Sequence, residues 1–256
     1  MRVIGQPETY SDILVRVFVT TLVTGVICTA VLAVASPEVK RLLDSIGTEA
    51  ELGPIKSLKL LYVAIPALFA LFSRVIKLHD RVSDILRLRC VIDTRWILVP
   101  LAEGVALQLD DARRVSIKRE RKDAMYQVFY PYVSLPDAKI DRQLVRSALD
   151  NIGWFWAAVE ATVLLVVTTI LLYLLDASGW GLTVLVAAGI TTCFCIILWM
   201  ACKRTTTNEV RGILQDPERR AAIRAYFERL WSKEAPAPPS PAPTGTTVKR
   251  AGASEA

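Results

Sequence analysis

The sequence predicts an all-α integral membrane protein in which two transmembrane helical hairpins flank a helical cytoplasmic insert. Four apolar runs are each near the roughly 20 residues that a helix needs to cross a bilayer core. A charged stretch, residues 77–152, separates the second run from the third and carries 14 Lys or Arg and 11 Asp or Glu. A short turn separates the last two runs. The runs cover residues 17–35, 57–76, 154–175 and 179–202.

Basic residues indicate how the chain is oriented in the membrane. Residues 77–152 and the tail from Lys203 onward hold 14 and 10 Lys or Arg, whereas the turn Asp176–Ser178 holds none. Lys and Arg accumulate in cytoplasmic loops. We therefore expect a multi-pass protein of the plasma (inner) membrane with both termini in the cytoplasm. The formal charge of +6 fits this bias, and no groove-reading motif points to nucleic acid.

These segments give the expected domain organisation. Ala33-Val34-Ala35 resembles a signal cleavage site, but the run before it exceeds the usual apolar region of roughly 7–15 residues, so we expect a retained anchor. The expected parts are an N-terminal hairpin (1–76), a helical cytoplasmic module (77–152), a C-terminal hairpin (153–203), an amphipathic helix (204–233) and a disordered tail (234–256).

The first run carries small residues at every fourth position. Thr21, Gly25, Thr29 and Ala33 form a stripe that allows another helix to approach closely. The stripe fits packing inside the monomer, and a dimer seam is the alternative. The second run contains Pro66, which predicts a kink, and its apolar length is marginal, so a tilted or re-entrant segment is a second interpretation.

Glu160 is a carboxylate inside the third apolar run. An ionisable residue within a membrane is costly and is a candidate for function. It lies about 9 Å along the helix from Trp154, which marks the inner edge. Two interpretations stay open: Glu160 is a gating residue, or it pairs with Arg74 near the inner end of the second run or reaches the headgroups.

The charged stretch is predicted to be helical from residue 77 to residue 135. Its short apolar run, Trp96–Leu101, is too short to span and forms either the core of a small domain, which we favour, or a segment in the membrane surface. A basic run follows. It is a candidate contact for anionic lipid, and a phosphorylated ligand is the alternative. The basic run consists of Arg113, Arg114, Lys118, Arg119, Arg121 and Lys122.

Two helix starts are marked by their capping residues. Ser134-Leu135-Pro136-Asp137 has the pattern of a capping box. We expect one helix of about 40 residues from there to Asp176, long enough to connect the cytoplasmic module to the bilayer. Asp216-Pro217-Glu218 begins a further helix, whose basic amphipathic pattern fits the inner leaflet or a docking surface on the module.

Catalytic motifs are lacking in the sequence. There is one histidine, His79, and neither the zinc-protease, the nucleophile-elbow, the Walker nor the Rossmann pattern occurs. Cys193 and Cys195 are two positions apart, so on a helix they point about 200° apart and do not converge on a metal. We expect no enzyme activity, no cofactor and no metal.

The layout resembles the four-transmembrane effector proteins of bacterial nucleotide-signalling anti-phage defence systems. The features concerned are the two hairpin pairs around the charged insert, and the run Phe129–Ser134 that leads into Trp154-Phe155-Trp156. The resemblance covers the architecture of most of the chain, and no ligand site is carried over from it. It implies a membrane domain that disrupts the inner membrane when triggered.

Three functions follow from these observations. The first is an oligomeric, pore-like effector gated through its cytoplasmic module by a small signalling nucleotide or a partner protein. The second is a scaffold or accessory subunit of a membrane complex, which the small-residue stripe and the tail helix support equally. The third is a small transporter, which usually shows internal repeats and interrupted helices; here Pro66 is the one such interruption.

Overall fold

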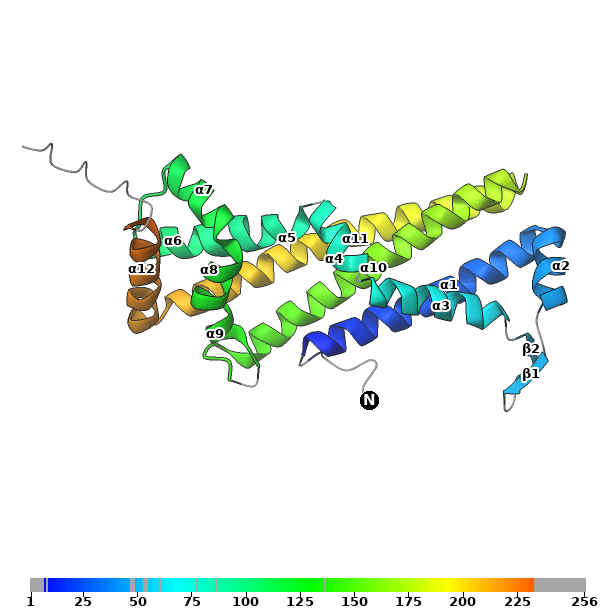
Figure 1. Cartoon of the computed structure of the whole chain (residues 1–256), viewed down its shortest axis with the longest axis horizontal. Coiled ribbons are helices and arrows are strands. Elements are labelled where there is room, and N and C mark those ends of the chain that lie inside the picture. Colours follow the sequence, from blue (N-terminus) through cyan, green and yellow to red (C-terminus); the bar gives the residue numbers. More distant parts are fainter. Residues whose placement is uncertain are drawn as a thin grey trace, which may run out of the picture.

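A computed structural model describes residues 7, 9–46, 49–52, 55–59, 61–76, 78–85, 87–135 and 137–232. The described chain is helical apart from one small sheet (Figure 1). The predicted disordered tail, 234–256, lies outside the described residues.

The two longest helices, α10 (Arg142–Leu174) and α11 (Ser178–Leu214), form an antiparallel hairpin (Figure 1). The two helices are about 50 Å and about 55 Å long by the helical rise, well beyond the roughly 30 Å of a bilayer core. Asp176, with φ of 55°, turns the chain between them. Both helices therefore extend past any membrane that they cross.

α1 (Tyr10–Ala35) and α3 (Leu61–Val75) pack beside the half of this hairpin that contains the turn at Asp176 (Figure 1). Thr9 and Asp12 form a reciprocal capping box that starts α1. Between α1 and α3 lie α2 (Pro37–Ile46) and an antiparallel pair of strands, β1 (Glu49–Leu52) and β2 (Ile55–Lys59). The described chain is all-α as predicted, and this loop adds one small two-stranded sheet.

Three of the described helices are long and apolar enough to cross a membrane, namely α1 from Ser11, α10 and α11. α3 is apolar but has 15 residues and contains Pro66. Its length, about 22 Å, is short of the bilayer core. The structure thus supports three of the four predicted crossings by length and leaves the segment around Pro66 as the weakest one.

The insert, residues 78–135, is a chain of short helices. It packs against the half of the hairpin away from the turn. The prediction of helix throughout is wrong in detail: Val91–Leu98 forms wide π-type turns, and residues 105–110 form a loop. The π segment precedes Pro100. The proline ring clashes with the carbonyl of the residue four positions earlier, so this carbonyl does not form an ordinary α-helical hydrogen bond. The elements are α4 (Leu78–Ile85), α5 (Leu88–Cys90), η1 (Val91–Leu98), α6 (Val99–Gly104), α7 (Asp111–Arg119), α8 (Arg121–Val128) and α9 (Tyr130–Val133).

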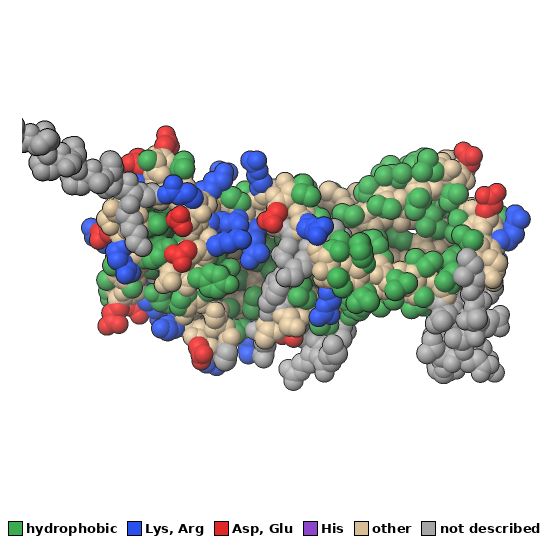
Figure 2. Space-filling view, viewed as in Figure 1, with side chains coloured by type: hydrophobic (Ala, Val, Ile, Leu, Met, Phe, Trp, Pro, Cys, Tyr) green, Lys and Arg blue, Asp and Glu red, His purple; other side chains and the backbone are tan. Residues whose placement is uncertain are grey.

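The insert shares one hydrophobic core with the hairpin. Leu98 and Leu101 are fully buried, which confirms that the run Trp96–Leu101 is a core segment. The same core contains Phe155 of α10 and Ile213 of α11. Figure 2 shows the resulting division of the surface: hydrophobic side chains cover the half formed by α1, α3 and the hairpin tip, and Lys and Arg gather over the insert.

Two predicted helix starts have different outcomes. α10 begins at Arg142, where the Asp141 side chain accepts a hydrogen bond from the Gln143 N–H, and not at Ser134. Ser134 instead ends α9 in extended conformation. α12 (Pro217–Ser232) begins as predicted, with Asp216 accepting from the Glu218 N–H, and it docks on the insert by burying Ile223 and Phe227.

Candidate functional site

The candidate site is a cavity at the junction of the insert and the hairpin. Its volume is about 880 Å³. The walls come from η1, α8, α9, α10 and α11, so segments about a hundred residues apart enclose one space. The lining is mostly apolar, with Phe129, Val145 and Leu149 among the wall residues. Pockets with this size and lining are typical of small-molecule sites.

Glu209 of α11 contributes a carboxylate to this cavity. The residue is 5% exposed. Among the described residues, neither a hydrogen bond nor an ion pair reaches its side chain. A buried carboxylate without a partner is costly in free energy. Sequence reasoning missed Glu209, although it shares a helix face with Cys202, Thr206 and Ile213, and an acid on such a face is the signal that was available.

Asp93 of η1 also lines the cavity and does have a partner. Arg121 Nε of α8 lies 3.6 Å from Oδ2 of Asp93, and both side chains are largely buried. Burial raises the pKa of Asp93, while Arg121 and Arg89 oppose that rise. The structure thus neutralises this carboxylate with nearby guanidinium groups, in contrast to Glu209.

The predicted basic run does not form one surface. Its first two members, Arg113 and Arg114, contact other parts of the molecule than the last four do. Arg113 stacks on Trp231 with 4.7 Å to the ring centroid, and Arg114 pairs with exposed Glu103 at 3.6 Å. Arg113 thus joins α7 to α12, and Arg114 joins α7 to α6.

The rest of the basic run borders a second depression of about 610 Å³ between α7, α8 and the end of α4. Five basic side chains and three acidic ones line it, namely Arg87, Lys118, Arg119, Arg121 and Lys122 with Asp84, Glu120 and Asp123. Arg119 pairs with Glu120 at 3.4 Å and Arg121 with Asp93, whereas Lys118 and Lys122 have no ion pair among the described residues. The depression is therefore the part of the predicted basic run that can receive an anion.

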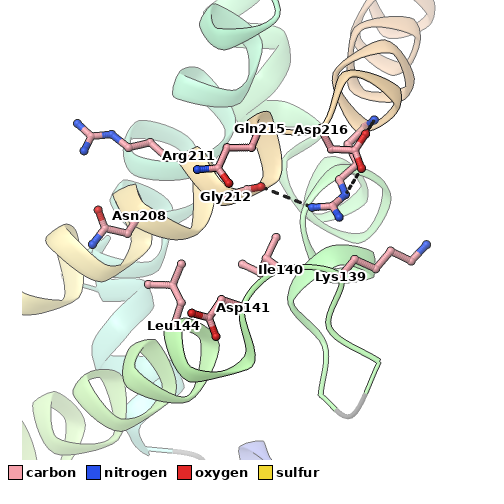
Figure 3. A pocket seen from close by; sticks show the side chains of 10 residues that line it. Lys139, Ile140, Asp141, Leu144, Asn208, Arg211, Gly212, Gln215 and Asp216 are labelled. Carbon is pink, nitrogen blue, oxygen red and sulfur yellow. Dashed lines mark hydrogen bonds and ion pairs between the residues drawn. The ribbon is translucent and has the colours of Figure 1, made fainter.

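A third depression lies where the base of α10 meets α11 (Figure 3). Arg219 is held there by the Gly212 carbonyl at 3.5 Å and by Asp216 at 3.2 Å. Arg211 and Lys139 extend to opposite sides (Figure 3). The cations do not converge on one point, so this depression is a weaker candidate for an anion site.

Glu160, the predicted intramembrane carboxylate, lies buried between three helices. The Thr21 hydroxyl of α1 donates a hydrogen bond of 2.5 Å to Oε2 of Glu160, and the Ser73 hydroxyl of α3 lies 3.4 Å from both carboxylate oxygens. Of the open interpretations, pairing with Arg74 is not what the structure shows, because Arg74 is exposed and the preceding residue, Ser73, makes the contact. Glu160 joins α10 to α1 and α3.

The small-residue stripe of α1 packs inside the monomer. Thr21 is buried against Glu160, and Ala33 is buried as well. A Cβ added at Gly25 would lie 2.9 Å from Cβ of Pro66, so glycine is what allows α3 to approach at its proline. Thr29 donates to its own backbone, at the Gly25 carbonyl. The face predicted for helix packing is thus occupied within the chain.

α1 and α10 also form an ion pair that the sequence did not predict. Arg16 Nη1 of α1 is 2.7 Å from Oδ1 of Asp150 on α10. The same guanidinium lies over the Trp154 ring, 4.7 Å from its centroid. Basic and aromatic groups of this kind are typical of the edge of a bilayer. Among the described residues, no group of three or more His, Cys, Asp or Glu could hold a metal ion.

Comparisons with known proteins place the chain in a family. No curated protein and no solved structure matches it. The model of the YmfE protein family matches residues 9–229, which include every helix from α1 to α11 and most of α12. The chain therefore belongs to the YmfE protein family.

Proposed function

We propose that this protein is a non-enzymatic, multi-pass membrane effector whose insert receives a signal and gates a pore-like or membrane-disrupting assembly. The observation that carries the proposal is the continuity of α10 and α11. Each helix runs unbroken from its apolar half into the core that it shares with the insert. A change in the packing of the insert therefore acts directly on helices long enough to cross the membrane.

The distribution of charge supports an orientation with the insert and both termini in the cytoplasm. Lys and Arg gather over the insert (Figure 2), and the opposite end of the hairpin is the short turn at Asp176, which carries no Lys or Arg. In this arrangement α1 and α3 form the second hairpin, giving four crossings in the inner membrane. A bilayer accommodates a short segment such as α3 by local thinning.

The receiver is the depression lined by Lys118, Lys122 and Arg87. These cations fit the phosphates of a small signalling nucleotide, and Arg121 extends from this depression to Asp93 of η1. An anion bound beside Arg121 competes with Asp93 for the guanidinium. The insert thus contains a contact that a phosphorylated ligand can alter.

Aromatic packing connects η1 to both long helices. Trp96 of η1 and Trp199 of α11 have ring centroids 4.4 Å apart, and Trp199 lies 5.4 Å from Phe155 of α10. A shift of η1 therefore displaces a ring wedged between α10 and α11. These contacts lie at the inner end of the apolar segments, where a change in helix packing alters the membrane half.

An exposed apolar face on α11 supports assembly. Ile190, Phe194 and Ile197 are each about half exposed or more, and their partners are lipid or a second copy of the chain. There is little support for a polar path lined by threonine hydroxyls within one chain. Thr168, Thr169, Thr191 and Thr192 donate to their own helix backbones.

A scaffold or accessory subunit is the second candidate, and the docked helix α12 favours it. α12 covers the end of the insert and turns basic side chains such as Arg220 and Arg224 outward, which suits a partner protein. A small transporter is the third candidate. Its support is the presence of Pro66 inside α3.

Expression in cells separates these functions. We expect the effector to cause growth arrest with loss of membrane potential, and Lys118→Glu together with Lys122→Glu to change the threshold for arrest. The charge-matched control is Lys40→Glu with Arg41→Glu on α2, at the opposite end of the molecule. Normal growth and potential with stable co-purification of a partner would instead identify a scaffold.

A further inference from the structure

The cavity at the junction of the insert and the hairpin combines an apolar wall with one unpartnered carboxylate. Its volume of about 880 Å³ accommodates a small organic molecule. It is separate from the basic depression used in the proposed function, because the two lie on opposite ends of the Arg121–Asp93 contact. The walls come from both the insert and the hairpin, so a ligand here contacts both.

Glu209 determines the charge that the cavity can accept. Arg89 and Asp93 are the other charged side chains on the wall. Asp93 is paired with Arg121, and Arg89 bonds the Tyr130 hydroxyl. Glu209 is 95% buried and has no partner among the described residues. Among the described residues, Glu209 is therefore the acidic group of this wall that has neither an ion pair nor a hydrogen bond.

The rest of the wall favours a cation with an apolar body. An anion next to Glu209 would meet an acidic group, and a neutral apolar molecule would leave that group buried and unpaired. Tyr126, Phe129 and Tyr130 place aromatic rings on the wall. Aromatic faces attract ammonium groups. The Glu209 carboxylate and the aromatic rings thus both favour an ammonium group.

We propose that this cavity binds an organic amine, with the ammonium group paired to Glu209 and the apolar body against Phe129, Val145 and Leu149. The ligand bridges η1 and α9 of the insert to α10 and α11 of the hairpin. Such a ligand stabilises the junction, since it binds the folded arrangement of both parts. Binding of an amine here does not depend on whether the protein permeabilises membranes.

The test is calorimetric titration of the full chain in lipid nanodiscs with two matched probes. Tryptamine carries an ammonium group, and tryptophol replaces that group with a hydroxyl. Wild type should bind tryptamine at least tenfold more tightly than tryptophol. Glu209→Gln should remove this preference, and Glu218→Gln, an exposed acid on α12, should retain it. Empty nanodiscs give the background from partition into lipid.

A second variant covers the case in which Glu209→Gln unfolds. Ala148→Leu narrows the cavity from α10 and leaves Glu209 in place, so it should weaken tryptamine binding with the hairpin still folded by circular dichroism. Equal binding of both probes to wild type would overturn the proposal, as would tryptamine binding that neither variant weakens. Absence of binding by folded wild type would show that the cavity is not an amine site.

Discussion

The Thr21 hydroxyl on α1 donates a 2.5 Å hydrogen bond to the Glu160 carboxylate on α10, across 139 positions of sequence. Ser73 of α3 completes the cluster. The three residues join α1, α3 and α10. A carboxylate buried in an apolar layer thus holds one hairpin against the other.

Removing the Thr21 hydroxyl should destabilise this junction. Thr21→Val keeps the shape and leaves Glu160 with the longer Ser73 contacts, at an expected cost of about 0.5–2 kcal/mol. Thermal unfolding in detergent, followed by circular dichroism, measures the change. Thr183→Val is the matched control, since Thr183 is exposed and bonds its own backbone. Equal stabilities of the two variants would show that the Thr21 bond contributes nothing.

Gly25 should tolerate no side chain. Gly25→Ala places a Cβ against Pro66, and overpacking of this kind costs about 1–3 kcal/mol. Gly189→Ala on α11 is the control, because nothing lies within 4 Å of its added Cβ. The control should be neutral or stabilising by helix propensity. A Gly25→Ala protein as stable as the control would mean that α3 does not pack closely on α1.

The Arg16–Asp150 pair should contribute measurably because Arg16 is 6% exposed. Asp150→Asn removes a charged hydrogen bond, at an expected cost of about 1.5–3 kcal/mol. The exposed pair Arg224–Glu228 gives the comparison, and Glu228→Gln should cost about 0.5 kcal/mol or less. Exchanging the two residues, Arg16→Asp with Asp150→Arg, should recover part of the loss. No recovery would locate the effect in the Trp154 contact.

Asp93 should make stability depend on pH. Burial raises its pKa above the ordinary value of 3.8, so its contribution is fully present below that value and is lost as pH rises through the folded pKa. Asp93→Asn cannot ionise and should therefore gain stability relative to wild type between about pH 4 and about pH 7. Melting temperatures across this range measure the difference, with exposed Asp137→Asn as control. A relative loss by Asp93→Asn would mean that Arg121 outweighs burial.

Local patterns predicted the long helices but not where α10 begins. Apolar length and a polar turn are local properties, which is why the hairpin around Asp176 follows from the sequence. Ser134-Leu135-Pro136-Asp137 and Asp141 both offer helix caps, and the sequence does not rank them. In the structure the Lys139 N–H bonds the Tyr132 carbonyl, closing a loop that delays the helix to Arg142.

The partners of the candidate residues depended on tertiary contacts. The spacing of Thr21 and Gly25 predicted close packing, but Pro66 and Glu160 are their partners only because α3 and α10 meet α1. The basic run looked continuous, but Arg113 and Arg114 contact Trp231 and Glu103, and the other four residues line a separate depression. Glu209 resembles a surface acid among Arg204 and Arg211, and packing of the insert buries it.

Conductance of planar bilayers containing the purified full chain tests the proposed function most directly. It is measured with and without a nucleotide extract from cells. We predict conductance that rises with the extract in wild type and is lost with Lys118→Glu and Lys122→Glu, whereas the Lys40→Glu and Arg41→Glu control retains it. Folded protein that gives no conductance under either condition would contradict the effector and favour the scaffold.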